Sequence, residues 1–318
     1  MSVYAADLAA VRDAAARIAG RARRTPVATC TTLDQLAGRS LFFKCEQYQK
    51  SGSFKFRGAC NAVMKLSDAD AARGVATHSS GNFAQAVALA ARARGIAAHV
   101  VMPRNAPVVK RRAVEGYGAR VVSCATALEA RESMLAQVVA ETGASPLHPY
   151  DHADVIAGQG TAALELLEEV PDLDAIVAPV GGGGLISGIA IAATELCSGI
   201  RIFGAEPQGA DDAARSKQAG RIIPMTAPDT IADGLVTSLG ELTWPVLRDR
   251  VEAIVTVSEA EIVAAMRLAW ERGKLLIEPS AAVALAAVLQ LSFRALHGIG
   301  RVGVVLSGGN VDLDRLPW

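Results

Sequence analysis

The chain has 318 residues, enough to bury a sizeable core as one large α/β domain or as two domains. Its 32 basic and 32 acidic residues leave no net charge, which argues against nucleic acid or an anionic membrane as a partner. Five widely spaced cysteines without a Cys-x-x-Cys pair argue against a disulfide framework and a zinc site. A reducing, cytoplasmic location is the expectation that follows.

The N-terminal part of the chain predicts a surface helix followed by a strand. Residues 2–24 mix charges into an alanine-rich helical pattern and lack the apolar stretch of a secretion signal. Thr25-Pro26 ends that pattern, and residues 40–46 predict a strand that leads toward Lys55. A helix is expected from about residue 57 to residue 66.

The next part of the chain alternates regularly between strand and helix patterns. Strands are predicted at 75–78, 97–102 and 120–123, and helices at 83–94, 106–117 and 128–141. Such alternation is typical of a parallel sheet wrapped by helices, and this stretch could form a compact domain of its own.

The alternation resumes with a helix at 154–169, and it predicts a second parallel layer. This layer has strands at 176–180, 201–206, 254–257 and 301–306, and helices from 184 to about 197, at 259–272 and at 280–291. Residues 208–243 are rich in Gly, Pro, Asp and Ser and predict ordered loops. The uncharged run 175–194 is long enough to span a bilayer, but Pro179 and four glycines interrupt it, so a buried strand, turn and helix are expected.

Lys55 lies between two aromatic residues in Ser-Gly-Ser-Phe-Lys-Phe-Arg, residues 51–57. Loss of hydration beside Phe54 and Phe56 would lower the pKa of the ammonium and free the amine as a nucleophile or base. The structural alternative is a lysine on a half-buried strand that extends its charge to water.

The four glycines from Gly181 to Gly184 follow an apolar strand and open a predicted helix. Their backbone N–H groups and the helix dipole can bind a phosphate. A dinucleotide site is the alternative, because Glu206 ends the next strand where a ribose-binding acid would lie. The G-x-G-x-x-G spacing fails, since Ile186 or Ser187 occupies the position of its last glycine.

Two further turns carry polar groups at the ends of predicted strands. Ser79-Ser80-Gly81-Asn82 lies between a strand and a helix and suits a carboxylate, although a plain helix cap explains it equally well. Ser307, in Ser-Gly-Gly-Asn (307–310), ends the last strand, and open α/β sheets bind ligands at that edge.

Six motifs together resemble the serine/threonine dehydratase and serine racemase family, the tryptophan-synthase-β-like group of pyridoxal-phosphate enzymes. In chain order they are SGSFKFRG (51–58), HSSGN (78–82), VIAGQGT (155–161), PVGGGGL (179–185), TIADG (230–234) and LSGGN (306–310). This resemblance covers nearly the whole chain and implies fold type II, an α/β fold of two open, mostly parallel twisted sheets wrapped by helices. It also implies a homodimer and an active site between a large domain (1–73 and 151–318) and a small mobile domain (74–150).

The resemblance implies that Lys55 carries pyridoxal 5'-phosphate and removes the α-proton of the substrate. The other implied cofactor contacts are Phe54, Asn82, Gly181, Gly182, Gly183, Gly184, Leu185 and Ser307. A neutral Ser307 hydroxyl stabilises a pyridinium less than a carboxylate would, which favours prompt loss of a β-leaving group. We therefore predict β-elimination, in which threonine, serine or a 3-hydroxy analogue is dehydrated to a keto acid and ammonia.

The resemblance also implies a set of substrate contacts, namely Ser79, Ser80, Asn82, Phe83, Arg131 and Thr237. Ser80 matches the racemase position that protonates the face opposite Lys55, so racemisation of serine or aspartate is the alternative. Arg131 matches a racemase arginine near the substrate carboxylate, and a solvated helix arginine is the other interpretation. Phe83 replaces the usual histidine, which leaves the choice of substrate open.

A divalent-cation site is implied by the same resemblance. Its residues are Glu206, Ala210 and Asp212, and two carboxylates with a backbone carbonyl suit Mg²⁺ or Ca²⁺. An acidic loop that holds no ion is the alternative.

Overall fold

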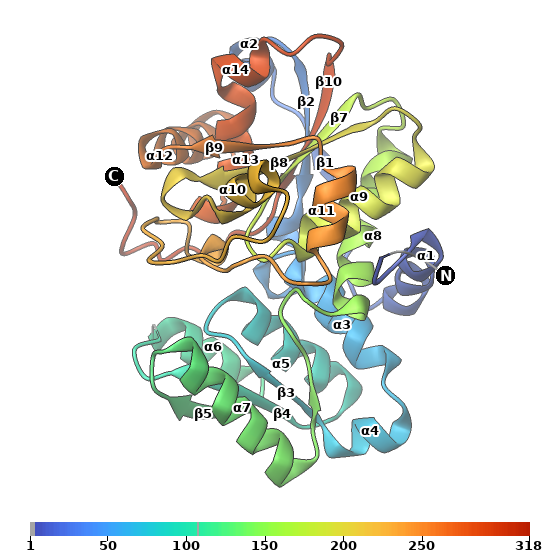
Figure 1. The fold of residues 1–318 in the computed structure, drawn as a ribbon, viewed down its shortest axis with the longest axis vertical. Coiled ribbons are helices and arrows are strands. Elements are labelled where there is room, and N and C mark those ends of the chain that lie inside the picture. The colour runs from blue at the N-terminus through green and yellow to red at the C-terminus, as the bar shows by residue number, and fades with distance from the viewer. Residues whose placement is uncertain (1–3, 107) are drawn as a thin grey trace.

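The computed structural model describes residues 4–106 and 108–318, which form two lobes of unequal size (Figure 1). The larger lobe holds a six-stranded sheet and the smaller lobe a four-stranded sheet. Apart from β1 with β2, the paired strands among the described residues run parallel. The predicted class, two mostly parallel sheets wrapped by helices, is confirmed. Residues 2, 3 and 107 of the predicted helices lie outside the described part of the chain.

The large sheet has the strand order β1-β2-β10-β7-β8-β9. Its strands are β1 (Val27–Ala28), β2 (Ser40–Cys45), β10 (Arg301–Leu306), β7 (Ala175–Pro179), β8 (Arg201–Pro207) and β9 (Ala253–Val257). Residues along β7 alternate between two buried clusters, with Val177 in one and both Ile176 and Ala178 in the other. Both faces of this sheet are therefore covered.

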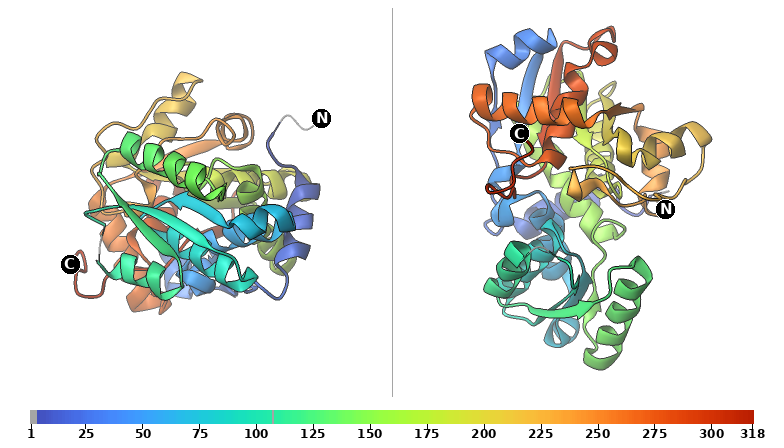
Figure 2. Two further views of the ribbon diagram at one scale, coloured as in Figure 1. Left: turned by 90° about the horizontal axis from the view of Figure 1, so that it is seen from below. Right: turned by 90° about the vertical axis from the view of Figure 1, so that its left-hand side faces the viewer.

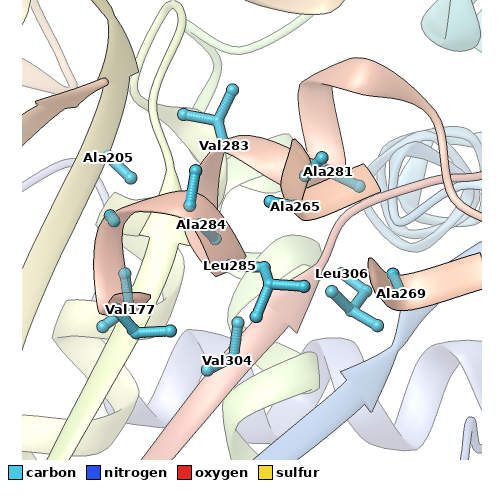
Figure 3. Close-up of a cluster of buried hydrophobic side chains, with 14 of the residues drawn as sticks. Val177, Ala205, Ala265, Ala269, Ala281, Val283, Ala284, Leu285, Val304 and Leu306 are labelled. Carbon is cyan, nitrogen blue, oxygen red and sulfur yellow. The ribbon is translucent and has the colours of Figure 1, made fainter. Parts of the chain in front are cut away.

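One face packs against α13 (Pro279–Leu289), together with α2 (Thr31–Ala37) and α12 (Glu259–Leu268). Figure 3 shows Leu285 of α13 close to Val304 and Leu306 of β10 in this core. The other face is covered by α1 (Leu8–Ile18), α8 (Ala153–Glu169), α9 (Gly184–Leu196) and α11 (Trp244–Arg250).

The small sheet has the order β5-β4-β3-β6, with β5 (Arg120–Cys124), β4 (Ala98–Pro103), β3 (Val75–His78) and β6 (Ser145–Pro146). Helices α5 (Asn82–Arg94) and α6 (Val108–Gly116) contribute to the core on one face, and α7 (Leu128–Thr142) covers the other. Figure 2 shows the same arrangement from two further directions.

Helix α3 (Lys55–Lys65) lies where the two lobes meet (Figure 1). Its buried residues Phe56, Ala59 and Val63 share a core with α5 and β3 of the small lobe, and its other side packs against α8. The remaining helices are α4 (Asp68–Arg73), α10 (Asp212–Ala219), α14 (Leu291–Arg294) and the short turns η1 (Glu46–Tyr48), η2 (Lys50–Gly52), η3 (Gln208–Ala210), η4 (Asp233–Leu235) and η5 (Ala269–Gly273).

The carboxyl ends of the parallel strands gather the predicted functional segments. Because β7, β8 and β10 are parallel, the glycines after β7, Glu206 near the end of β8 and Ser307 after β10 lie at the same edge of the large sheet. Among the described helices, none has the length and apolar character needed to cross a membrane.

Candidate active site

Lys55 is the first residue of α3, and its side chain is half-buried. Its Nζ donates to the Pro149 carbonyl at 2.8 Å and lies 5.1 Å from the ring centroid of Phe54, 5.7 Å from that of Phe83 and 6.0 Å from that of Tyr150. Desolvation in this aromatic surrounding lowers the pKa of Lys55 to about 8. The amine is directed into the protein instead of extending to bulk water.

The turn before Lys55 is fixed against the segment that follows β10. Ser53 pairs with Gly308, and the Phe54 N–H donates to the Ser307 carbonyl at 3.0 Å. Gly52 has φ of +74°, and a Cβ there would lie 2.2 Å from Asn310 Oδ1, so only glycine fits. The structure thus brings Ser307, which is buried, next to the backbone that starts α3.

The four glycines form a cradle, the turn from Gly181 to Gly184, in which neighbouring residues leave no room for side chains. A Cβ on Gly182 would lie 2.3 Å from the ring of Tyr150, and Gly183 has φ of +87°. Thr243 Oγ1 lies 2.8 Å from the Gly182 carbonyl and holds the turn from behind. Because α9 begins at Gly184, the N–H groups of its first turn are available to an anion.

Tyr150 joins the lysine to this glycine turn. Its ring centroid lies 6.0 Å from the Lys55 amine, and the same ring packs against Gly182. Burial raises the pKa of Tyr150 to about 12, while a hydrogen bond with Thr237 acts in the opposite direction. Thr237 Oγ1 would also lie 3.4 Å from a Cβ on Gly181, so this predicted substrate residue is beside the cradle.

The turn Ser79 to Asn82 connects β3 to α5 and reaches across to the large lobe. The Ser79 hydroxyl accepts from the Gly81 N–H at 3.3 Å. Asn82 Nδ2 donates to Glu278 Oε1 at 2.8 Å, and Asn82 Oδ1 accepts from Asn310 Nδ2 at 2.9 Å. Ser80 is half-buried on this turn.

Glu278 is the centre of the link between the lobes. Burial, with the nearby charge of Asp233, raises the pKa of Glu278 to about 8. Its second oxygen accepts from the Asn310 N–H at 3.1 Å. Sequence reasoning missed Glu278, Pro149, Tyr150 and Thr243, because their partners in the site come from distant parts of the chain.

Of the remaining predicted residues, Phe83 and Leu185 lie near Lys55 or at the glycine turn, whereas Arg131 is held by its own loop. Phe83 is buried in the core of the small lobe with its ring facing the Lys55 amine, and Leu185 is buried in the first turn of α9. The Arg131 guanidinium donates to the Thr126 carbonyl at 2.7 and 3.1 Å, so it is bound to the loop that leads into its own helix, α7. Its contact with a substrate carboxylate stays a prediction.

Two buried acids lie at the start of α10. Glu206 accepts from the Ala213 and Ala214 N–H groups at 3.1 and 2.9 Å, and Asp212 Oδ2 accepts from the Leu239 N–H at 3.2 Å. Burial raises the pKa of Glu206 well above its usual range and that of Asp212 to about 6. Asp212 Oδ1 is buried without a hydrogen-bond partner. Among the described residues no three His, Cys, Asp or Glu side chains form a cation cluster.

Comparison with known proteins identifies the family to which this site belongs. The model of the family described as "Pyridoxal-phosphate dependent enzyme" matches residues 18–308. The chain belongs to this family. The resemblance seen in the six sequence motifs is therefore confirmed.

Relatives of this pyridoxal-phosphate dependent enzyme include racemases and a dehydratase. It is 51% identical over 316 residues to a serine racemase of Oryza sativa subsp. indica, covering 98% of this chain and 93% of that protein. It is 52% identical over 302 residues to a β-hydroxyaspartate dehydratase of Paracoccus denitrificans, covering 95% of each. The solved structure of maize serine racemase matches with a TM-score of 0.97 at 50% identity, covering 98% of this chain and 95% of that chain.

The residues on this site fit the cofactor that defines the family. The glycine cradle at the start of α9 suits the phosphate, and the desolvated Lys55 amine suits a covalent attachment. Ser307 offers an uncharged hydroxyl at the end of β10. The pyridoxal-phosphate chemistry of the family and the donors present in this chain agree.

Proposed function

We propose that this protein is a pyridoxal-phosphate dependent serine racemase that also dehydrates serine. The observation that carries the proposal is the Lys55 amine, whose pKa burial lowers to about 8 and which lies next to Tyr150, the ring that packs against Gly182. Racemisation is placed before dehydration because Ser80 offers a hydroxyl on the substrate turn and the racemase relatives cover almost the whole chain. This reverses the order in which the sequence alone ranks the two reactions.

When bound, pyridoxal phosphate would draw electrons from the α-carbon of an amino acid and acidify its α-proton. Lys55 would remove that proton, and its depressed pKa makes it a competent base near neutral pH. Ser80 would exchange a proton on the opposite face, which inverts the configuration. Phe54, Phe83 and Tyr150 would keep water from the reacting atoms.

The other cofactor and substrate roles follow from the placement of the turns. The N–H groups from Gly181 to Gly184 would bind the phosphate, with Leu185 beneath them, and Ser307 would face the ring nitrogen. Asn82 would face the ring oxygen once its bond to Glu278 rearranges. Ser79, Arg131 and Thr237 would bind the substrate carboxylate. We further propose that residues 74–150 move as one unit to close the site and that the enzyme is a cytoplasmic homodimer.

Dehydration of a β-hydroxy amino acid is the second candidate. This reaction uses the same removal of the α-proton by Lys55, followed by loss of the β-hydroxyl. It needs no proton donor at Ser80 on the opposite face. The 52% identical relative named β-hydroxyaspartate dehydratase supports it, as does the neutral Ser307 hydroxyl.

A product assay decides between the two reactions. Purified holoenzyme is given L-serine, and D-serine is measured by chiral chromatography while keto acid is measured in the same sample. We expect both products, with D-serine formed from L-serine and L-serine from D-serine. If keto acid forms from serine, threonine or 3-hydroxyaspartate but no D-serine forms, the protein is a dehydratase and not a racemase. Thermal stabilisation by NAD but not by pyridoxal phosphate would contradict both candidates.

We also propose that Glu206, Asp212 and the Ala210 carbonyl bind Mg²⁺ or Ca²⁺. The unpaired, buried Asp212 Oδ1 supports this, because two close carboxylates in a buried place need a cation or a proton. Added Ca²⁺ is expected to raise the melting temperature by several degrees over EDTA-treated protein. Asp212→Asn should remove this response, whereas Asp211→Asn, which alters a half-exposed neighbour paired with Arg215, should keep it. Equal melting temperatures with Ca²⁺ and with EDTA would contradict the cation site and would mean that these acids only cap the start of α10.

A further inference from the structure

The motif at 155–161 lies on α8, between the helix that carries the lysine and the helix that carries the glycine cradle. A Cβ on Gly158 would lie 2.6 Å from Gly58 Cα of α3, and a Cβ on Gly160 would lie 2.7 Å from the Gly188 carbonyl of α9. Both glycines therefore permit close backbone approach. Because α3 begins at Lys55 and α9 begins at Gly184, α8 sets the separation of the two halves of the cofactor site.

Gln159 lies between these two glycines and is fully buried. Its Oε1 accepts from the Gly58 N–H at 3.1 Å. In a regular helix that N–H would donate to the carbonyl four residues earlier, but the Phe54 carbonyl accepts from Arg57 N at 2.9 Å. Phe54 also provides no side-chain cap, so Gln159 completes the first turn of α3 from a neighbouring helix.

Only one end of the Gln159 amide has a hydrogen-bond partner. Its Nε2 is buried with no hydrogen-bond partner, and an unpaired buried donor destabilises the folded state. A methionine of similar length would remove that unpaired donor but would leave the buried Gly58 N–H without its acceptor. The carbonyl oxygen, which reaches the turn that starts with Lys55, is the part of the side chain with a function.

A side chain of α3, next to Gly58 in the sequence, anchors the helix without Gln159. Arg57 is completely buried, and its Nε and Nη1 donate to Glu46 and Glu165 at 2.7 Å each. Thr161 accepts from the same guanidinium at 3.2 Å. Loss of the Gln159 carbonyl would therefore leave the Gly58 N–H unpaired and free the backbone of the first turn to shift, while the Arg57 side chain keeps α3 in place.

We propose that Gln159 is a positioning residue whose carbonyl fixes the first turn of α3 and so aims the amine of Lys55. The inference rests on the proposed role of Lys55 as cofactor anchor and base. It extends that role to a residue on another helix, which contacts the backbone of α3 at Gly58.

Three variants test the proposal in the holoenzyme. Gln159→Met removes the acceptor together with the unpaired donor, Gln159→Asn keeps an amide that is too short, and Gln159→Glu keeps an acceptor of full length. We expect the Met and Asn variants to lose kcat by about 10- to 100-fold, because a misplacement of about 1 Å is enough for this. The pH midpoint of the visible absorbance of the bound cofactor should shift in both, and the Glu variant should recover at least part of kcat.

The control is Gln290→Met, at the end of α13, which removes hydrogen bonds to Thr256 and Glu261. It should lower the melting temperature and leave kcat and the absorbance midpoint unchanged. Wild-type kcat and midpoint in the Met and Asn variants would overturn the proposal, as would failure of both to fold, since Gln159 would then serve stability alone. If borohydride traps no cofactor on wild-type Lys55, the proposed function fails instead.

Discussion

Lys55→Ala is expected to lower kcat/KM for serine by at least about 10³-fold, because in the proposed mechanism one amine supplies both the covalent anchor and the base. The variant should still fold, since Lys55 makes a single hydrogen bond, to the Pro149 carbonyl. Steady-state assays measure the loss, and mass spectrometry after borohydride reduction locates the cofactor. Lys65→Ala is the matched control, because Lys65 ends the same helix in an exposed pair with Asp154. Activity in Lys55→Ala close to that of the control would refute the assignment.

The pH dependence of cofactor attachment tests the same amine in the wild-type apoprotein. Burial lowers the pKa of Lys55 from 10.5 to about 8, so the reactive neutral form accumulates as the pH rises through about 8. The rate of attachment, followed by absorbance after mixing with pyridoxal phosphate, should rise about tenfold per pH unit below this value and then level off. The unfolded chain holds more protons between pH 8 and 10.5, so apoprotein stability should rise over that window. A midpoint near 10.5 would mean that the amine is solvated.

The alternation of strands and helices was predictable because each βα unit carries its own periodicity. The predicted strands at 75–78 and 301–306 coincide with β3 and β10. The short elements α2, α4, α11, β1 and β6 were not predicted, since two to seven residues give little periodic signal. Helix α10, within the segment predicted as loops, depends on Glu206 of β8 for the capping of its first turn. Such a cap comes from another element and has no local signature.

The candidate site was predictable only where the residues that suggest a function are neighbours in the sequence. Lys55 between aromatic residues and the four glycines are local patterns, and the structure places both at one junction. Tyr150 lacks any local pattern that would predict its contact with Gly182, because the fold alone brings the linker after β6 against the turn after β7. Glu278 escaped notice for the same reason, since its partners Asn82 and Asn310 lie far away in the sequence.

Ser80→Ala is expected to lower racemisation of serine by at least about 10²-fold while keto-acid formation stays within about threefold of wild type. Elimination needs proton removal on the Lys55 face only, whereas inversion also needs an acid on the other face. The fold does not require the Ser80 hydroxyl, because Gly81 N donates to Ser79 and not to Ser80. Ser79→Ala is therefore the matched control, and by loosening the turn it should slow both reactions alike.

Proton exchange in D₂O separates the two faces of the substrate more sharply than product ratios do. Wild-type enzyme should exchange the α-proton of both L- and D-serine, as followed by NMR. In Ser80→Ala, Lys55 remains, so exchange from L-serine should persist with retention of configuration, whereas exchange from D-serine should fall with racemisation. Because Lys55 is on α3 and Ser80 is on the turn before α5, this asymmetry would assign one face of the substrate to each of these two elements. Equal exchange from both enantiomers in Ser80→Ala would remove Ser80 from the reaction and transfer the second proton to another group.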